Sequence, residues 1–243
     1  MVPRSFAGEE LLLPEGRAVY WPREQALLVA DLHLEKASFF AQHGQPLPPY
    51  DSRETLERVA LAIRETGARR VITLGDNFHD SHGAARLEPH ACGMLQALTR
   101  AVDWVWITGN HDIGRDGHGA HQRAYANCGG TLVEEMELAG VILRHEAKKG
   151  ETRPELSGHF HPRIQIHVRQ RRIVRPCAVI SANENADGSR SGRMILPAFG
   201  ALTAGMSAAD PAILKALQPA RSIDAVVPAA GRLATFPLWR QAA

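Results

Sequence analysis

Residues 26–33 read ALLVADLH, an apolar run that ends in an acidic residue and a histidine. The apolar part, residues 26–30, predicts a short buried strand, because it is continuous and too short for a buried helix. Side chains of an extended segment alternate between two sides, so Asp31 and His33 share one side and can converge on one point. The stretch therefore predicts a buried strand that carries two metal-ligand side chains at its carboxyl end.

The same pattern recurs twice downstream. Residues 71–76 read VITLGD and residues 104–110 read WVWITGN, so two more apolar runs lead into Asp76 and Asn110. Helical patterns separate the three runs. Strands that alternate with helices and end in polar residues predict an α/β fold, with the ligands at the carboxyl ends of the strands.

Two helices are expected between these runs. The first starts near Asp51, where Glu54 is placed to complete a capping box, and it ends at Gly67. The second covers about residues 88–100 and leads into the third apolar run.

The second half of the chain changes character after Gly130. It contains short strand-like pieces without helices between them, at residues 141–143, 163–168, 172–180 and 194–198. Such a series predicts largely antiparallel pairing, and the polar residues 181–193 predict a long hairpin loop. Because the candidate ligands extend from residue 31 to residue 161, both halves must build one site. We therefore expect a single domain over residues 1–243, with its core at about 20–205 and an Ala/Pro-rich tail, 206–243, left unassigned.

The composition is ordinary for a soluble globular protein, with 44% hydrophobic and 22% charged residues. A net charge of +2 permits an acidic partner such as nucleic acid without arguing for one. The three cysteines show no zinc-finger or Cys-x-x-Cys spacing. No stretch has the pattern of a signal peptide or the length of a membrane span. We expect a soluble cytoplasmic protein with reduced thiols and no membrane association.

Seven residues in five short segments are candidate metal ligands: Asp31, His33, Asp76, Asn110, His145, His159 and His161. Carboxylate, imidazole and amide donors without thiolate suit Mn, Fe or Zn better than calcium or copper. Seven ligands exceed one tetrahedral site and suit two ions that share a bridging carboxylate. Two ions about 3.5–4 Å apart can stabilise both the attacking and the leaving oxygen of a phosphoester.

The series D-x-H, GD, GNHD, H and GHxH resembles the calcineurin-like binuclear metallophosphoesterases. The resemblance implies a four-layer αββα sandwich with mixed sheets and a two-metal site. One metal is then expected on Asp31, His33 and His161, and the other on Asn110, His145 and His159. Asp76 is expected to bridge the two metals.

The resemblance also implies that His111 contacts the phosphate and protonates the leaving oxygen, while Asp112 orients its imidazole. Two positions depart from the family pattern. Glu146 follows His145 where many members have glycine, and His79 stands where many have Asp or Asn. His79 is therefore expected to contact the substrate and to favour diesters over monoesters.

His118 and His121 lie in a glycine-rich loop after the GNHD segment. A loop beside the metals is a reasonable place for substrate contacts, and the alternative is a pair of solvent-exposed loop histidines.

A narrower group fits more closely. Residues 31–36 (DLHLEK), 75–80 (GDNFHD) and 196–200 (LPAFG) are similar to the ligase-associated DNA damage response endonuclease group, which consists of small bacterial manganese-dependent phosphodiesterases. The resemblance implies a DNA endonuclease in DNA repair that favours single strands and is functionally associated with a DNA ligase and a helicase. Manganese is the expected metal, and Fe, Zn, Ni or Co would suit the same ligands.

Two matters stay open from the sequence. A basic cluster formed by Arg169, Arg171, Arg172 and Arg175 either tracks a DNA backbone or is a solvated hairpin. The same two-metal site would also serve a phosphomonoesterase or a nucleotide phosphohydrolase. A non-catalytic scaffold is the remaining alternative, and the intact ligand set argues against it.

Overall fold

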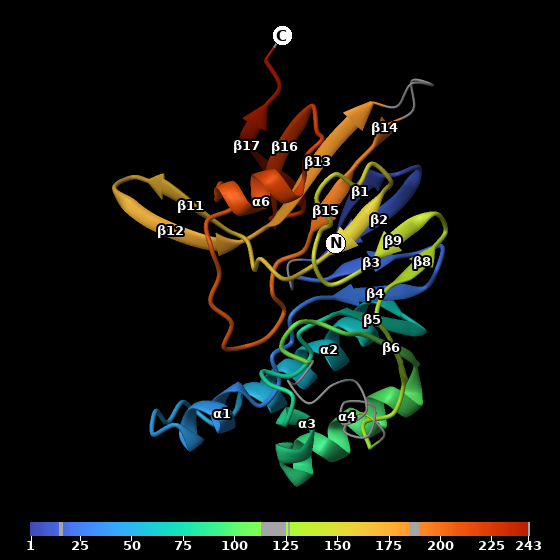
Figure 1. Cartoon of the computed structure of the whole chain (residues 1–243), viewed down its shortest axis with the longest axis vertical. Coiled ribbons are helices and arrows are strands. Elements are labelled where there is room, and N and C mark those ends of the chain that lie inside the picture. The colour runs from blue at the N-terminus through green and yellow to red at the C-terminus, as the bar shows by residue number, and fades with distance from the viewer. Residues whose placement is uncertain (15–16, 113–124, 126, 185–189, 243) are drawn as a thin grey trace.

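The first of two facing sheets carries the three predicted strand-to-ligand junctions (Figure 1). The computed structural model describes residues 1–14, 17–112, 125, 127–184 and 190–242. The seven strands of this sheet lie in chain order: β1 Val2–Phe6, β2 Glu9–Leu13, β3 Val19–Trp21, β4 Ala26–Val29, β5 Arg70–Leu74, β6 Asp103–Ile107 and β7 Thr131–Val133. From β1 to β4 the strands pair antiparallel, and from β4 to β7 they pair parallel. The carboxyl ends of β4, β5 and β6 therefore meet at one edge.

The second sheet is built from the later part of the chain. Its path runs through β17 Arg232–Arg240, β16 Ser222–Ala229, β13 Ala178–Glu184, β15 Arg193–Ile195, β10 Glu155–Ser157, β9 Val141–Leu143 and β8 Met136–Leu138, with β14 Arg190–Ser191 paired to β13. Most neighbours pair antiparallel, as predicted, but β10 pairs parallel with both β9 and β15. The unassigned tail contributes β16 and β17 to this sheet.

A separate hairpin, β11 Arg163–Val168 with β12 Arg171–Pro176, extends away from the second sheet (Figure 1). Ile164 and Ile166 lie on its inner face and pack against a hydrophobic cluster that includes Ile213 of the helix α6, Pro211–Ala216. The other face, with Gln165 and His167, is exposed.

Helices cover the outer side of the first sheet. They are α2 Asp51–Thr66, α3 Gly83–Arg86 and α4 Pro89–Ala101, while α1 Lys36–Gln42 projects beside them and the short α6 Pro211–Ala216 lies on the second sheet (Figure 1). The helix α4 starts as expected for its sequence, because the Glu88 side chain accepts hydrogen bonds from the amides of His90 and Ala91. Gly67 ends α2 in the left-handed conformation, with φ of 69°. Among the helices that the described residues form, none combines the length and apolar character that a membrane span requires.

The continuous apolar run of β4 is explained by burial on both faces. Ala26 and Leu28 point into the core between the sheets, while Leu27 and Val29 point toward the helices. Burial of each such leucine contributes about 1.5–3 kcal/mol to folding.

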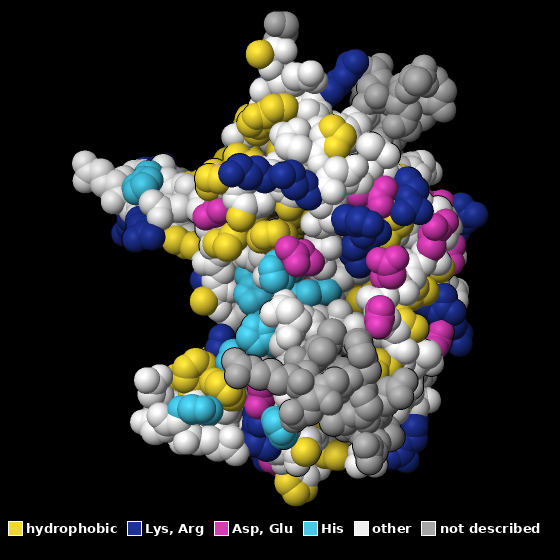
Figure 2. Space-filling view, viewed as in Figure 1, with side chains coloured by type: hydrophobic (Ala, Val, Ile, Leu, Met, Phe, Trp, Pro, Cys, Tyr) yellow, Lys and Arg dark blue, Asp and Glu magenta, His cyan; other side chains and the backbone are white. Residues whose placement is uncertain are grey.

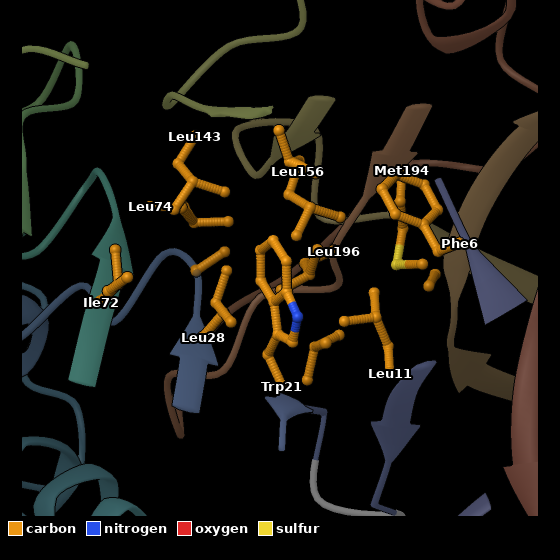
Figure 3. Packing of buried hydrophobic residues seen from close by; sticks show 14 of the residues in the cluster. Phe6, Leu11, Trp21, Leu28, Ile72, Leu74, Leu143, Leu156, Met194 and Leu196 are labelled. Atoms are coloured by element: carbon orange, nitrogen blue, oxygen red, sulfur yellow. The ribbon is translucent and has the colours of Figure 1, made fainter. Parts of the chain in front are cut away.

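The core between the sheets joins the two halves of the chain (Figure 3). Trp21 and Leu28 of the first sheet pack in one cluster with Leu156, Met194 and Leu196 from the second half, and all five side chains are 0% exposed. One shared core makes the two sheets a single domain. The layers run helix, sheet, sheet, helix, so the expected α/β sandwich with mixed sheets is confirmed, with α6 as a thin fourth layer.

The segment 196–200, which the resemblance singled out, ties the sheets together beside β4. The amides of Phe199 and Gly200 donate to the carbonyl oxygens of Ala30 (2.8 Å) and Asp31 (3.2 Å). A Cβ at Gly200 would lie 2.2 Å from the carbonyl oxygen of Leu32, so only glycine permits this approach. The backbone around Asp31 is therefore held from both sheets.

Candidate metal centre

The loops that follow β4 and β5 run side by side and are joined by backbone hydrogen bonds. The amide of Asp31 donates to the carbonyl oxygen of Gly75 (3.1 Å), and the amide of His33 donates to that of Asp76 (2.9 Å). From the second sheet, the amide of His159 donates to both carboxylate oxygens of Asp31, each at 3.0 Å. These bonds bring ligand segments from both halves of the chain to one point.

A first cluster of ligand atoms consists of Asp31, His33, Asp76 and His161, whose atoms lie within 4.8 Å of one another. The Nε2 atoms of His33 and His161 are 3.2 Å apart. His161 Nε2 lies 3.6 Å from Asp31 Oδ1, and His33 Nε2 lies 3.7 Å from Asp76 Oδ2. This is the set expected for one metal, together with the expected bridge.

A second cluster consists of Asp76, His145 and His159. Asn110 joins it, because its Oδ1 lies 2.8 Å from His145 Nε2 and 3.0 Å from His159 Nδ1. Asp76 Oδ1 lies 3.4 Å from His145 Nε2. The two oxygens of Asp76 thus face different clusters, as a bridging carboxylate would.

Hydrogen bonds at the far ring nitrogens determine which nitrogen of two histidines faces the centre. His145 Nδ1 donates to the carbonyl oxygen of Leu74 (3.0 Å), and His161 Nδ1 donates to that of Ala204 (3.1 Å). A carbonyl oxygen only accepts, so Nδ1 carries the hydrogen in both rings. In its neutral form each ring therefore directs the Nε2 lone pair at the cluster, and this is the form that binds metals.

The buried carboxylates provide the test of whether a metal fits here. Asp31 and Asp76 are 0% and 2% exposed. In the described ranges, their nearest titratable partners are histidines and neither pairs with Lys or Arg. Buried charges in proteins are paired or coordinate metals, so this donor set fits divalent cations.

Burial also keeps two of the imidazoles in the neutral form that a metal requires. Burial, together with the neighbouring His161 and His111, lowers the pKa of His33 well below its usual value. Burial and His145 likewise lower the pKa of His159. For His161 burial acts in the same direction, but the hydrogen bond and charge of Asp31 outweigh it and raise the pKa.

Five of the candidate ligands have left-handed backbone conformations. Their φ angles are 54° at Asp31, 44° at His33, 47° at Asp76, 72° at His159 and 48° at His161. Such conformations cost of order 1–3 kcal/mol each in non-glycine residues and persist only where the surroundings impose them. Their concentration at one centre marks it as a functional site.

The glycine before each of three ligands leaves room for a ligand from another segment. A Cβ at Gly109 would lie 2.3 Å from Asp76 Oδ1, and a Cβ at Gly75 would lie 2.4 Å from His145 Nδ1. At Gly158 it would lie 2.8 Å from Asp31 Oδ2. The GD, GNHD and GHxH segments therefore need glycine at these positions, because any side chain would collide with a ligand of the cluster.

His111 lies at the open side of the centre, with its side chain 40% exposed. Its Nδ1 donates to the carbonyl oxygen of His79 (2.8 Å), and its Nε2 lies 4.0 Å from Asp76 Oδ2. The ring is thus oriented by a backbone carbonyl, with its second nitrogen available toward the cluster.

The expected role of Asp112 in orienting His111 was wrong. Asp112 is buried and its carboxylate accepts from the backbone amides of Gly109, Asn77 and Phe78. The hydroxyl of Tyr125 also donates to it, at 2.8 Å. Burial raises the pKa of Asp112 to about 6, although the backbone hydrogen bonds oppose the shift. Adjacent residues point to opposite sides of this loop, so Asp112 holds the β5 and β6 loops together while His111 faces outward.

His79 lies behind the first cluster and is not among its ligands. Its Nδ1 is 3.3 Å from His33 Nδ1, and its ring stacks on that of His111 at an interplanar angle of 23°. Burial, Lys36 and His111 lower the pKa of His79 to about 4, so the ring is neutral near pH 7. His118 and His121 lie outside the described residues.

The sequence pattern did not single out Phe39 and Phe40, whose rings contact His79. The signal that could have found them is the pair of consecutive aromatic residues that follows the DLHLEK stretch after Ala37 and Ser38.

A family model and one solved structure agree with this geometry. The family model described as calcineurin-like phosphoesterase matches residues 25–167, the range that contains all seven candidate ligands. The solved structure of the Pseudomonas putida nuclease MPE is 30% identical, covers 97% of this chain and 98% of its own, and superposes with a TM-score of 0.66. A protein of unknown function from Aquifex aeolicus, AQ665, is 14% identical over 60% of this chain and 80% of its own, with a TM-score of 0.38. No curated protein matches the chain.

Proposed function

We propose, on the premise that this chain belongs to the calcineurin-like phosphoesterase family and hydrolyses phosphoester bonds, that it is a metal-dependent DNA endonuclease favouring single strands. The observation that carries the proposal is the pair of donor clusters that share Asp76. The likeness over nearly the whole chain to a nuclease supports a nucleic-acid diester as substrate. The resemblance to the ligase-associated group supports manganese, a role in DNA repair and association with a DNA ligase and a helicase.

The first ion would be held by Asp31, His33 and His161 and the second by Asn110, His145 and His159, with Asp76 shared. When bound, two divalent ions supply an activated water and draw charge from the phosphate. The chain itself contributes a rigid donor set, because neutral imidazoles and buried carboxylates are already oriented by hydrogen bonds.

His111 is proposed to protonate the leaving oxygen. Its Nδ1 is committed to the carbonyl oxygen of His79, so Nε2 is the nitrogen that can give a proton at the open side of the centre. A proton delivered there offsets the charge that develops on the leaving oxygen.

Replacement of His111 by alanine is expected to slow cleavage by about 10²–10⁴-fold while both metals remain bound. Turnover on single-stranded DNA and the metal content of the same preparation check this result. His90→Ala, on an exposed site of α4, is the control and should leave both unchanged. A His111→Ala variant that loses metal would show that the residue is a ligand.

The hairpin of residues 163–176, called the basic hairpin below, favours a polyanionic substrate. It contains five arginines and no acidic residue. It starts two residues after His161, so it extends directly from the centre. Arg169, Arg171, Arg172 and Arg175 are exposed, and within the described part of the chain none of these four forms an ion pair. Unpaired arginines beside a phosphoesterase centre can bind backbone phosphates.

Combined replacement of Arg171, Arg172 and Arg175 by alanine is expected to weaken DNA binding and to flatten its salt dependence. Each lost phosphate contact lowers the slope of log K against log salt by about 0.7 for single strands, so the change is about 2. Fluorescence anisotropy with a catalytically inactive background measures it. A control triple variant at exposed arginines elsewhere, Arg64, Arg69 and Arg232, should keep the original slope.

The proposed function is tested by stripping the protein with a chelator and restoring activity with single divalent ions. Circular single-stranded DNA, a bis-aryl phosphate and a mono-aryl phosphate are then compared. Nicking of the circle and preference for the diester, strongest with manganese, are expected. Preference for the monoester without any nicking would instead support the phosphomonoesterase or nucleotide phosphohydrolase.

A further inference from the structure

Two phenylalanines of α1 lie outside the hydrophobic cores. Phe39 and Phe40 are only partly buried, and neither belongs to any of the three hydrophobic clusters formed by the described residues. Their ring neighbours are each other, at a centroid distance of 5.5 Å, and histidines. Phe39 lies 4.8 Å and Phe40 5.6 Å from the ring of His79. Apolar rings placed beside a polar centre, with no core to join, are not explained by folding.

Phe40 continues a row of rings that begins at the metal centre, and Phe39 lies edge-on beside this row, at 77° to His79 and 85° to Phe40. The ring of Phe40 is inclined by 28° to His79, and His79 by 23° to His111, with centroids 5.6 Å and 5.4 Å apart. His111 Nε2 in turn lies 4.0 Å from the shared carboxylate of Asp76. A nearly parallel series of ring faces therefore leads from the reacting position to the surface of α1.

The molecular surface is hollowed next to this row. Figure 2 shows a notch between two projecting lobes on the left, with histidine side chains gathered at its inner end. In the same view α1 forms the lower lobe and the basic hairpin the upper one (Figure 1). The lower lobe thus contains Phe39 and Phe40, and the upper lobe contains the exposed arginines of the basic hairpin.

We propose that Phe39 and Phe40 form a base-stacking wall that receives the nucleobases next to the cleaved phosphate, while the basic hairpin faces the backbone. The inference rests on the proposed function and deepens it by naming the residues that select a single strand. Aromatic side chains stack on bases without reading sequence. Bases of a duplex are already stacked and paired, so only an unpaired strand can turn its bases to this wall. Of the possible occupants, the unpaired strand is favoured because the wall adjoins the phosphoesterase centre and faces unpaired positive charge.

The first test compares a DNA substrate with a diester that carries no base. In the Phe39→Ala/Phe40→Ala variant, kcat/KM on a single-stranded oligonucleotide should fall by about 10-fold or more, since two stacking contacts are lost. Cleavage of an oligonucleotide built only of abasic residues, which has the diester but no aromatic group, should stay unchanged. Phe39→Leu/Phe40→Leu, which keeps apolar volume but no ring, should behave like the alanine variant, and Phe39→Tyr/Phe40→Tyr should restore cleavage. Equal loss on both substrates would mean that the rings support the centre structurally, which would overturn the inference.

The second test moves a single abasic residue along the oligonucleotide and maps the cuts. The native protein should cut poorly at a fixed distance from the abasic residue, and the double alanine variant should show a flat pattern. If the positions of the cuts made by the native protein did not depend on where the abasic residue lies, the proposed base-stacking wall would be wrong. The wall would also be overturned if the native protein were a dimer and the double alanine variant a monomer that cleaves DNA equally well. Phe39 and Phe40 would then serve to join two copies of the chain. Absence of nicking by the native protein on every DNA would instead refute the proposed function.

Discussion

Replacement of Asp76 by alanine is expected to abolish turnover and to remove metal from both positions. Its Oδ1 faces His145 and its Oδ2 faces His33, so no other side chain serves both clusters in the described structure. Its Oδ1 also accepts from the amide of His111 at 2.9 Å, which positions the candidate general acid. The variant should lose several kcal/mol of transition-state stabilisation, and such a loss lowers the rate of cleavage by about 10³-fold or more.

Metal content by elemental analysis and nicking of circular DNA should be measured on the same Asp76→Ala preparation. Asp103→Ala is the matched control, because Asp103 is an exposed carboxylate on β6 whose one ion pair among the described residues is with Arg70 at the surface. Substantial activity, or two metals retained by the Asp76 variant, would contradict the bridging role. Metal-free native protein would favour the scaffold alternative.

Replacement of Glu155 by alanine is expected to lower the free energy of unfolding by about 3–5 kcal/mol, because it leaves the buried Arg193 without its nearest counter-charge. Glu155 is 0% and Arg193 1% exposed. Glu155 Oε2 lies 3.8 Å from Arg193 Nη1 and 4.0 Å from Arg144 Nε. The guanidinium of Arg193 also donates to the carbonyl oxygen of Lys148 at 2.7 Å, so it cannot simply turn to solvent.

Urea unfolding of the chelated protein, followed by circular dichroism, measures this loss. Glu137→Ala removes an exposed carboxylate 3.7 Å from Arg153 and should cost no more than about 1 kcal/mol. If Glu155→Ala had a similarly small effect, the buried carboxylate would make no net contribution to the free energy of unfolding. Since Arg144 directly precedes His145, the variant should also bind metal more weakly.

The candidate ligands could be predicted from the sequence because the relevant signals are local. A buried strand is visible as a short apolar run, and its carboxyl end determines where the next polar side chain lies. The ends of α2 and α4 follow from Gly67 and Glu88 in the same way. The roles within the metal centre, as distinct from the positions, remain predictions that the experiments above test.

Interactions between distant elements were not accessible from the sequence. Asp51 was expected to begin α2 in a capping box, but its carboxylate accepts from the amide of Ala37 (3.1 Å) in α1. A carboxylate binds the free amide that is nearest in space, and that amide lies in another element. Asp112 was misassigned for the same reason. The strands β16 and β17 were missed because both contain proline, at Pro228 and Pro237, and because β16 joins the sheet through β13, which is distant in sequence.

All strands of the first sheet precede Glu134, and all strands of the second follow it. A chain divided at this exposed linker would yield two polypeptides, each with an incomplete set of donors. The earlier fragment would keep Asp31, His33, Asp76 and Asn110, and the later one His145, His159 and His161. Nicking by the mixture would then report reassociation of the fragments, so the fold lends itself to use as a split reporter whose signal requires complementation.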